Sequence, residues 1–179
     1  MLAQSLCELA AHVGLSQTAI ARHLGVERAN ISYWARGHRE VPEHHRAALL
    51  KLVFTHAKAQ AAHVKVQGQA ARAKGMLSHA HRRFFRKLFL LVVECRAENL
   101  AAHGLADTAS IAHVLRQLEH FKGMPQEELC KPETAQKLFA LSRGLANLAT
   151  VNEQHRSLME LAEELKDANI DALEPGTSR

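Results

Sequence analysis

The residues whose types and spacing best fit a chemical task lie in the segment QTAIARHLGVERANISYWAR, residues 17–36. Three apolar side chains fall on one side of a helix predicted over residues 27–36: Val26, Ile31 and Trp34. At about 100° per residue, the opposite side presents a guanidinium, a methyl group, a hydroxyl and, at its edge, a phenol: Arg28, Ala29, Ser32 and Tyr33. Because an α-helix fits the major groove of DNA, these side chains are predicted to contact base edges.

Each of these side chains suits a different contact. Arg28 can pair with two acceptors of guanine at once, and Ala29 can contact a thymine methyl group. Ser32 can bond a base or a phosphate, and Glu27 could accept a hydrogen bond from cytosine. Asn30 has the chemistry for adenine, but its angle places it beside the apolar side of the helix. We therefore interpret Asn30 as structural.

Four short helices must position these side chains, because glycine and proline divide the first 54 residues. The expected helices cover residues 2–13, 17–24, 27–36 and 42–54. Ser16 can cap the second helix, and Gly25 permits the tight turn that sets the third helix across the second. Ala21 is small where these two helices would cross. The alternative interpretation is a plain pair of packed helices with no DNA partner.

Residues 9–52 resemble the Cro/CI-type (XRE-like) helix-turn-helix family of DNA-binding proteins. The resemblance lies in the spacing within residues 17–36 and in the stretches ISYWARG and VPEHHRAALLKL. It implies a recognition helix in the major groove of double-stranded DNA and a bacterial or phage transcription regulator. It also implies a phosphate contact for Gln17, which with Thr18 opens a helix whose free amide groups suit an anion. Further phosphate contacts are expected from the residues that follow the third helix: Arg36, His38 and Arg39.

The charge of the chain is unevenly distributed. Residues 1–93 carry 14 Lys and Arg against four Glu, whereas residues 94–179 carry nine against 14 acidic residues. Residues 55–76 are predicted to form a basic connecting helix. From residue 51 to residue 86, every seventh residue is Lys, Arg or His: Lys51, Lys58, Lys65, Arg72, His79 and Arg86. On one helix such a row could follow a phosphate backbone, with contacts expected from Lys58, Lys65 and Arg72. If the helix is interrupted, the row is accidental.

The C-terminal half is predicted to associate with other copies of the chain. Expected helices cover residues 77–102, 107–121 and 133–169, and residues 171–179 are expected to be disordered. Apolar residues spaced by four and three give the long helix a coiled-coil seam with a polar Asn in it: Leu138, Leu141, Leu145, Leu148, Asn152, His155, Met159 and Ala162. Gly144 within this helix would be explained by close approach of a neighbouring helix. The alternative is a helix that packs only within its own chain.

Composition excludes several classes of protein. With 47% hydrophobic but only 4% aromatic residues and few β-branched ones, the chain is expected to be all-α. The longest strongly apolar run, residues 88–93, is too short to span a membrane. Three widely spaced cysteines point to a reducing cytoplasm rather than a disulfide framework. The 13 His lack the ligand spacing of a metal site, and no phosphate loop or nucleophile motif is present, so no metal, cofactor or enzymatic activity is expected.

Together these patterns predict an all-α protein with a DNA-binding domain over residues 1–54, a connecting helix over 55–76 and an association domain over 77–170. The leading hypothesis is a sequence-specific regulator of transcription that acts as a homo-oligomer, most simply a dimer. The stretch AQKLFALSRGLANLATVNEQHR (residues 135–156) resembles phage small terminase proteins, which implies a packaging role and a ring of subunits as the alternative. A third hypothesis is a DNA-bound adaptor that recruits another protein through its acidic C-terminal half.

Overall fold

A computed structural model of the chain describes residues 2–67, 79–148 and 153–170. Within these residues it contains nine α-helices and no strand, which confirms the all-α expectation. The chain divides into two compact units, residues 1–73 and residues 74–179, called here the N-terminal and C-terminal units. Among the described helices, none combines the length and the apolar character needed to cross a membrane.

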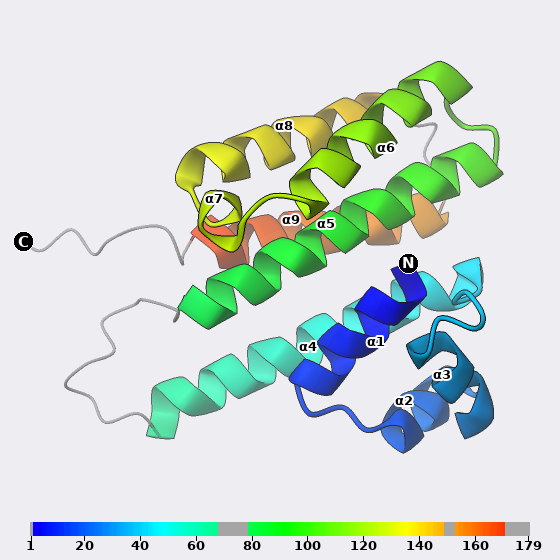
Figure 1. The fold of residues 1–179 in the computed structure, drawn as a ribbon, viewed down its shortest axis with the longest axis vertical. Coiled ribbons are helices and arrows are strands. Elements are labelled where there is room, and N and C mark those ends of the chain that lie inside the picture. The colour runs from blue at the N-terminus through cyan, green and yellow to red at the C-terminus, as the bar shows by residue number, and fades with distance from the viewer. Residues whose placement is uncertain (1, 68–78, 149–152, 171–179) are drawn as a thin grey trace, which may run out of the picture. The chain divides into compact units, whose positions relative to one another are not determined.

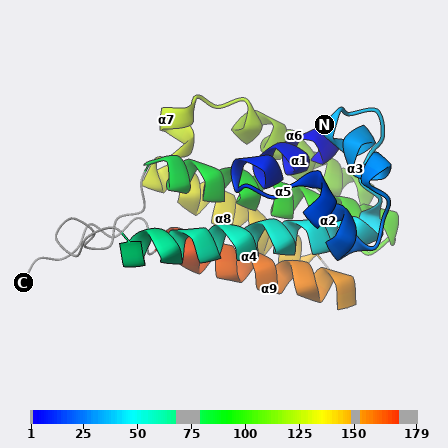
Figure 2. The same ribbon diagram turned by 90° about the horizontal axis from the view of Figure 1, so that it is seen from below.

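Three short helices pack near the start of one long helix in the N-terminal unit: α1 (Leu2–His12), α2 (Gln17–Leu24), α3 (Arg28–Ala35) and α4 (Glu43–Gln67). α1 packs on α3 and α4, and α2 packs on the same two helices. The end of α4 extends beyond the other three helices (Figures 1 and 2). The predicted boundaries of the first three helices are confirmed to within one residue at each end. The predicted end of the fourth helix at residue 54 is wrong, because the Ala-rich residues that follow continue it to Gln67.

The core of the N-terminal unit combines apolar side chains from all four helices. Its fully buried members include Leu6, Ala10, Ile31, Leu49, Leu50 and Val53. The side-chain amide of Gln60 on α4 donates a hydrogen bond to the backbone carbonyl of Val13 at 2.7 Å, which satisfies a carbonyl just after the end of α1. These contacts hold α1 against α4, and α2 and α3 pack on this pair of helices.

Four helices of the C-terminal unit run alternately up and down, with one short helix in a connection: α5 (His79–Ala102), α6 (Thr108–Lys122), α7 (Gln126–Leu129), α8 (Pro132–Asn147) and α9 (Glu153–Ile170). α5 packs on each of the others and most extensively on α9. Its apolar segment is buried nearly all round from Phe84 to Ala97. The predicted helices over residues 77–102 and 107–121 are confirmed within two residues at each end, and the side chain of Asp107 caps α6 by accepting from the Ser110 amide at 2.8 Å.

The single helix predicted over residues 133–169 is wrong. α8 ends at Asn147, and α9, which begins at Glu153, runs in the opposite direction beside it (Figure 1). The two helices therefore turn their apolar sides toward the same core. A continuous seam along one straight helix does not form.

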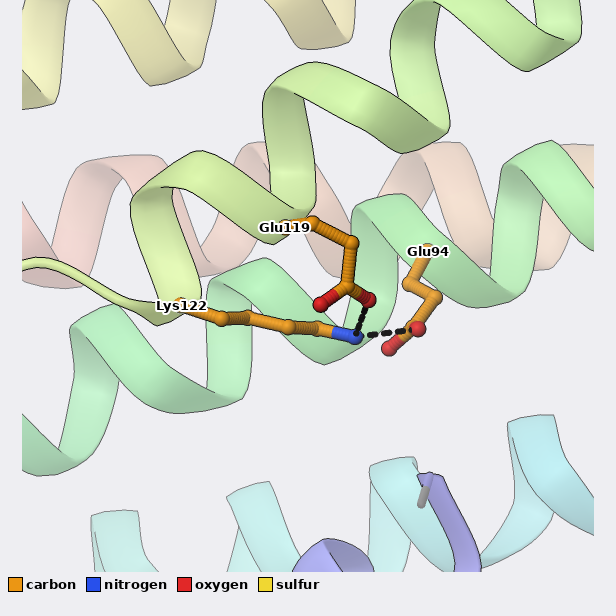
Figure 3. A network of polar contacts seen from close by, with 3 residues as sticks. All are labelled: Glu94, Glu119 and Lys122. Carbon is orange, nitrogen blue, oxygen red and sulfur yellow. Dashed lines mark hydrogen bonds and ion pairs between the residues drawn. The ribbon is translucent and has the colours of Figure 1, made fainter.

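Polar groups also join the helices of the C-terminal unit. The ammonium group of Lys122 on α6 forms an ion pair with the largely buried Glu94 on α5 and a second one with Glu119 at 3.1 Å (Figure 3). On another side of α5, buried Arg96 donates from Nη1 to the hydroxyl of Ser142 on α8 at 2.7 Å. Burial lowers the pKa of this guanidinium to about 10, and it lowers the pKa of the fully buried His155 on α9, with the Arg96 charge as a smaller cause in the same direction.

Candidate nucleic-acid interface

The turn between α2 and α3 is fixed by local hydrogen bonds. The hydroxyl of Ser16 accepts from the amide of Ala19 at 3.1 Å and caps α2, as expected from its position. Gly25 ends α2 with a φ of +66°, a conformation that suits glycine. The amide of Val26 then donates to the carbonyl of Ala21 at 3.0 Å. With the chain turned in this way, only Glu27 separates Val26 from the start of α3 at Arg28.

α3 has one buried and one solvent-facing side. Ile31 is completely buried and Trp34 is 4% exposed, which confirms two of the three predicted inward positions, whereas Val26 is half-buried. The side chains predicted to read bases are exposed or half-buried: Glu27, Arg28, Ala29, Ser32 and Tyr33. Asn30 is half-buried, in line with its predicted place beside the inward side. The structure thus presents the proposed reading residues together on one short helix.

Two of the outward residues are joined to each other. The Nη2 group of Arg36 donates a hydrogen bond to the hydroxyl oxygen of Ser32, one turn earlier, at 2.6 Å. The hydroxyl of Ser32 keeps its own proton available for an acceptor on a base or phosphate. Arg36 was predicted only as a phosphate contact after the helix, whereas it lies at the cap of α3, next to the base-reading residues.

The loop after α3 folds back so that its residues contact the last turn of the helix. Gly37 has a φ of +71°, and the amide of His38 donates to the carbonyl of Tyr33 at 3.0 Å. The guanidinium carbon of Arg39 then lies 5.1 Å from the centre of the Tyr33 ring, which is 41% exposed. Sequence reasoning missed this contact, because it depends on the conformation of the loop. Gly37, two residues after the end of α3, is the signal in the sequence that could have indicated it.

The start of α2 offers a second type of contact. Gln17 is half-buried and Thr18 is exposed at the first two positions of the helix. Their backbone amides precede the first intrahelical hydrogen bonds, so they can donate to an anion. The hydroxyl of Ser16 already accepts from the amide of Ala19, so an anion would accept from the amides of Gln17 and Thr18 instead.

The basic row predicted along the connection is only partly supported. Lys51 and Lys58 are exposed on α4. Lys65 lies on the same helix without a described side chain, and Arg72 lies outside the described residues. Arg86 belongs to α5 and is 1% exposed, so the extension of the row to this residue is wrong. A buried guanidinium cannot contact a phosphate backbone.

The residues gathered here can form hydrogen bonds and ionic contacts. Glu40, an acidic residue of the loop between α3 and α4, pairs with Arg46 at 3.2 Å, so its charge is partly balanced. In the described part of the chain, no cluster of three His, Cys, Asp or Glu side chains could hold a metal ion. Three guanidinium groups, those of Arg28, Arg36 and Arg39, are exposed on α3 and just after it.

The residues predicted for the oligomer seam are dispersed. Leu138 and Leu145 are completely buried within this chain, whereas Leu141 and Met159 are half-buried and Leu148 is 39% exposed. Asn152 lies outside the described residues. Because the expected long helix is two helices, the seam as predicted is wrong. Association through the side chains that remain accessible stays a prediction.

Comparison with known proteins identifies no relative. No protein-family model, no curated protein and no solved structure matches the chain.

Proposed function

We propose that this chain is a sequence-specific double-stranded DNA-binding protein, with α2 and α3 as a helix-turn-helix and α3 as the helix that enters the major groove. Arg28, Ala29 and Ser32 would contact base edges, with Tyr33 and Glu27 at the margins. Phosphates would be held by the start of α2 and by the basic residues at the end of α3: Gln17, Thr18, Arg36, His38 and Arg39. Lys58, Lys65 and Arg72 would extend the phosphate contacts along α4 and beyond.

One observation carries this proposal: the two sides of α3 have opposite characters. Its large apolar residues Ile31 and Trp34 are buried in the core, so Ala29 and the partly exposed ring of Tyr33 are the apolar groups left on the outward side. That outward side carries Arg28 and Arg36 without an acidic side chain between them along the helix. A short helix with this surface supports binding to a polyanion through the groove rather than packing within a larger core.

The test is selection of binding sites from random duplex DNA by the full-length protein, followed by titration of the selected site. Arg28→Ala is expected to relax the preference at one base pair and to weaken binding by about 1–3 kcal/mol, the range for one bidentate contact. Arg143→Ala, which removes an exposed guanidinium from α8, is the matched control and should leave binding unchanged. Failure to enrich any sequence would contradict the proposal. Affinities of the Arg28→Ala variant for selected and random DNA that both equal those of the unaltered chain would show that Arg28 does not read bases.

The biological role that we propose first is regulation of transcription by a dimer, as the resemblance of residues 9–52 implies. The resemblance of residues 135–156 to small terminase proteins supports a second role, recognition of viral DNA for packaging. Light scattering of the purified chain with and without DNA distinguishes these roles. Two subunits per complex favour regulation, whereas a ring of many subunits favours packaging.

A further inference from the structure

The C-terminal unit has an open groove between α6 and α8. Each of these helices packs on α5, and neither packs extensively on the other. The space between them measures about 1130 Å³. Residues from both helices line it over about three helical turns, from 109 to 121 on α6 and from 137 to 148 on α8. The groove is thus long enough to receive a segment of helix.

The floor of the groove is apolar. Val114 and Phe121 contribute from α6, and Leu141 and Leu145 from α8. At one end, Leu148 is 39% exposed, one of the two large apolar side chains that are exposed among the described residues. Val114, Phe121 and Leu145 are themselves buried, so the apolar floor is accessible to solvent mainly at the half-buried Leu141 and at Leu148. Apolar side chains that stay accessible in a groove are typical of an interaction site.

The rim of the groove is basic. It carries His113, Arg116 and His120 on α6 and Lys137 on α8, all of which are exposed. None of the described residues that line the groove is acidic, although residues 94–179 contain 14 acidic residues. Charge complementarity therefore favours an occupant with carboxylates along both sides of an apolar stripe.

Gly144 supports the approach of a helix. Glycine within a helix is less favourable than alanine, and neither a positive φ nor packing within this chain requires it here. A Cβ atom at this position would meet nothing within 4 Å. Ala140 lies one turn earlier on α8. Because neither residue has a large side chain, the backbone of another helix can approach α8 closely along this side of the groove.

We propose that this groove binds an amphipathic helix of another protein, with an apolar stripe flanked by Asp and Glu residues. A second copy of the chain fits less well. The same face of a second copy would oppose basic rim to basic rim. The acidic α9 offers exposed Glu160, Glu163 and Glu164, but its leucines are buried in its own core. The groove would thus give the protein a binding function in addition to DNA binding. Its rim is basic, whereas the adaptor hypothesis from the sequence expected an acidic surface to recruit the partner.

The experiment uses the full-length protein and three fluorescent synthetic helices of about 18 residues, or five turns. The first has a leucine stripe flanked by Glu, the second replaces each Glu with Lys, and the third replaces each Leu with Ser. Fluorescence anisotropy should show the first binding at least about tenfold more tightly than the other two. This result requires both the apolar floor and the basic rim.

Three variants locate the binding in the groove. Gly144→Leu places a large side chain in the groove. Because leucine favours helix and no atom lies within 4 Å of its Cβ, the fold should be retained while the affinity for the first probe falls at least about tenfold. The double variant Arg116→Glu with Lys137→Glu should reverse the preference toward the Lys-flanked probe. Arg143→Glu, an exposed change on α8 outside the groove lining, should bind like the unaltered chain.

Other results would overturn the proposal. Equal binding of the Glu-flanked and Lys-flanked probes would show a general apolar contact, and absence of binding by both would show that the groove takes no such helix. Unchanged affinity of Gly144→Leu would place the contact elsewhere. If light scattering shows an oligomer that Gly144→Leu converts to monomer, the occupant is a second copy and the assignment to another protein fails.

Discussion

Ser32 and Arg36 should act as one unit when the protein binds DNA. Their hydrogen bond of 2.6 Å holds the Arg36 side chain over the outward side of α3 before any contact with DNA is made. Without Ser32, that long side chain must be ordered at the moment of binding, which costs about 0.5–1.5 kcal/mol for one side chain. Ser32→Ala should therefore weaken binding about two- to thirteenfold, even where the hydroxyl itself makes no contact with a base.

A double-mutant cycle measures this coupling. When Arg36 is already alanine, Ser32→Ala no longer releases a guanidinium. The losses of the two single variants should then add up to more than the loss of the double variant, by about 0.5–1.5 kcal/mol. The assay is titration of a selected DNA site at one fixed salt concentration, with thermal unfolding as a check on the fold. Both side chains lie on the solvent-facing side, so the melting temperature should change little.

The result that refutes this reasoning is additivity. If the double variant equals the sum of the single ones within about 0.5 kcal/mol, the hydrogen bond plays no part in binding. Ser32→Thr provides the matched control, because it retains the hydroxyl that Arg36 contacts. It should stay close to the unaltered protein while Ser32→Ala does not.

Three further perturbations have defined outcomes. Gly25→Ala should destabilise the N-terminal unit by about 1–2 kcal/mol in urea unfolding, because its φ of +66° disfavours a Cβ atom; Gly25→Asn should lose less, and equal losses would point to another cause. His155 has a lowered pKa in the folded chain, so it takes up a proton more readily when unfolded; stability should fall as pH drops below about 6.5, by up to about 1.4 kcal/mol per pH unit. His155→Gln should reduce that slope, and an unchanged slope would exclude His155 as its source. Replacing Lys58, Lys65 and Arg72 together by Ala should lower the slope of log affinity against log salt by about 2.7, at about 0.9 per phosphate contact, whereas an unchanged slope would show that they face only solvent.

The first three helices could be predicted because their signals are local. Glycines at 14, 25 and 37 all adopt positive φ, and each follows the end of a helix that the sequence places within one residue. Ser16 is a cap whose hydrogen bond spans three residues. Likewise, the sides of α3 follow from the helical period alone, which is why Ile31 and Trp34 were correctly assigned to the core.

The break between α8 and α9 could not be predicted from such signals. Residues 144–153 contain a glycine that lies inside α8, where it does not end the helix, and no proline follows. What decides the break is that both helices bury leucines against α5, a contact between segments distant in sequence. The groove between α6 and α8 could not be predicted either, because it also depends on how helices distant in sequence pack together. The sequence indicates which sides of the helices are apolar, but not that α6 and α8 make little contact with each other.

The extensive contact between α5 and α9 has a consequence for synthesis of the chain. Among the described helices α5 carries the longest apolar segment, and the helix that it contacts most, α9, is synthesised well after it. Translation of the 50 residues between Ala102 and Glu153, at about 5–20 residues per second, takes roughly 3–10 s. During this interval the apolar surface of α5 lacks its principal cover. Chains interrupted before residue 153 should therefore be retained by chaperones or degraded.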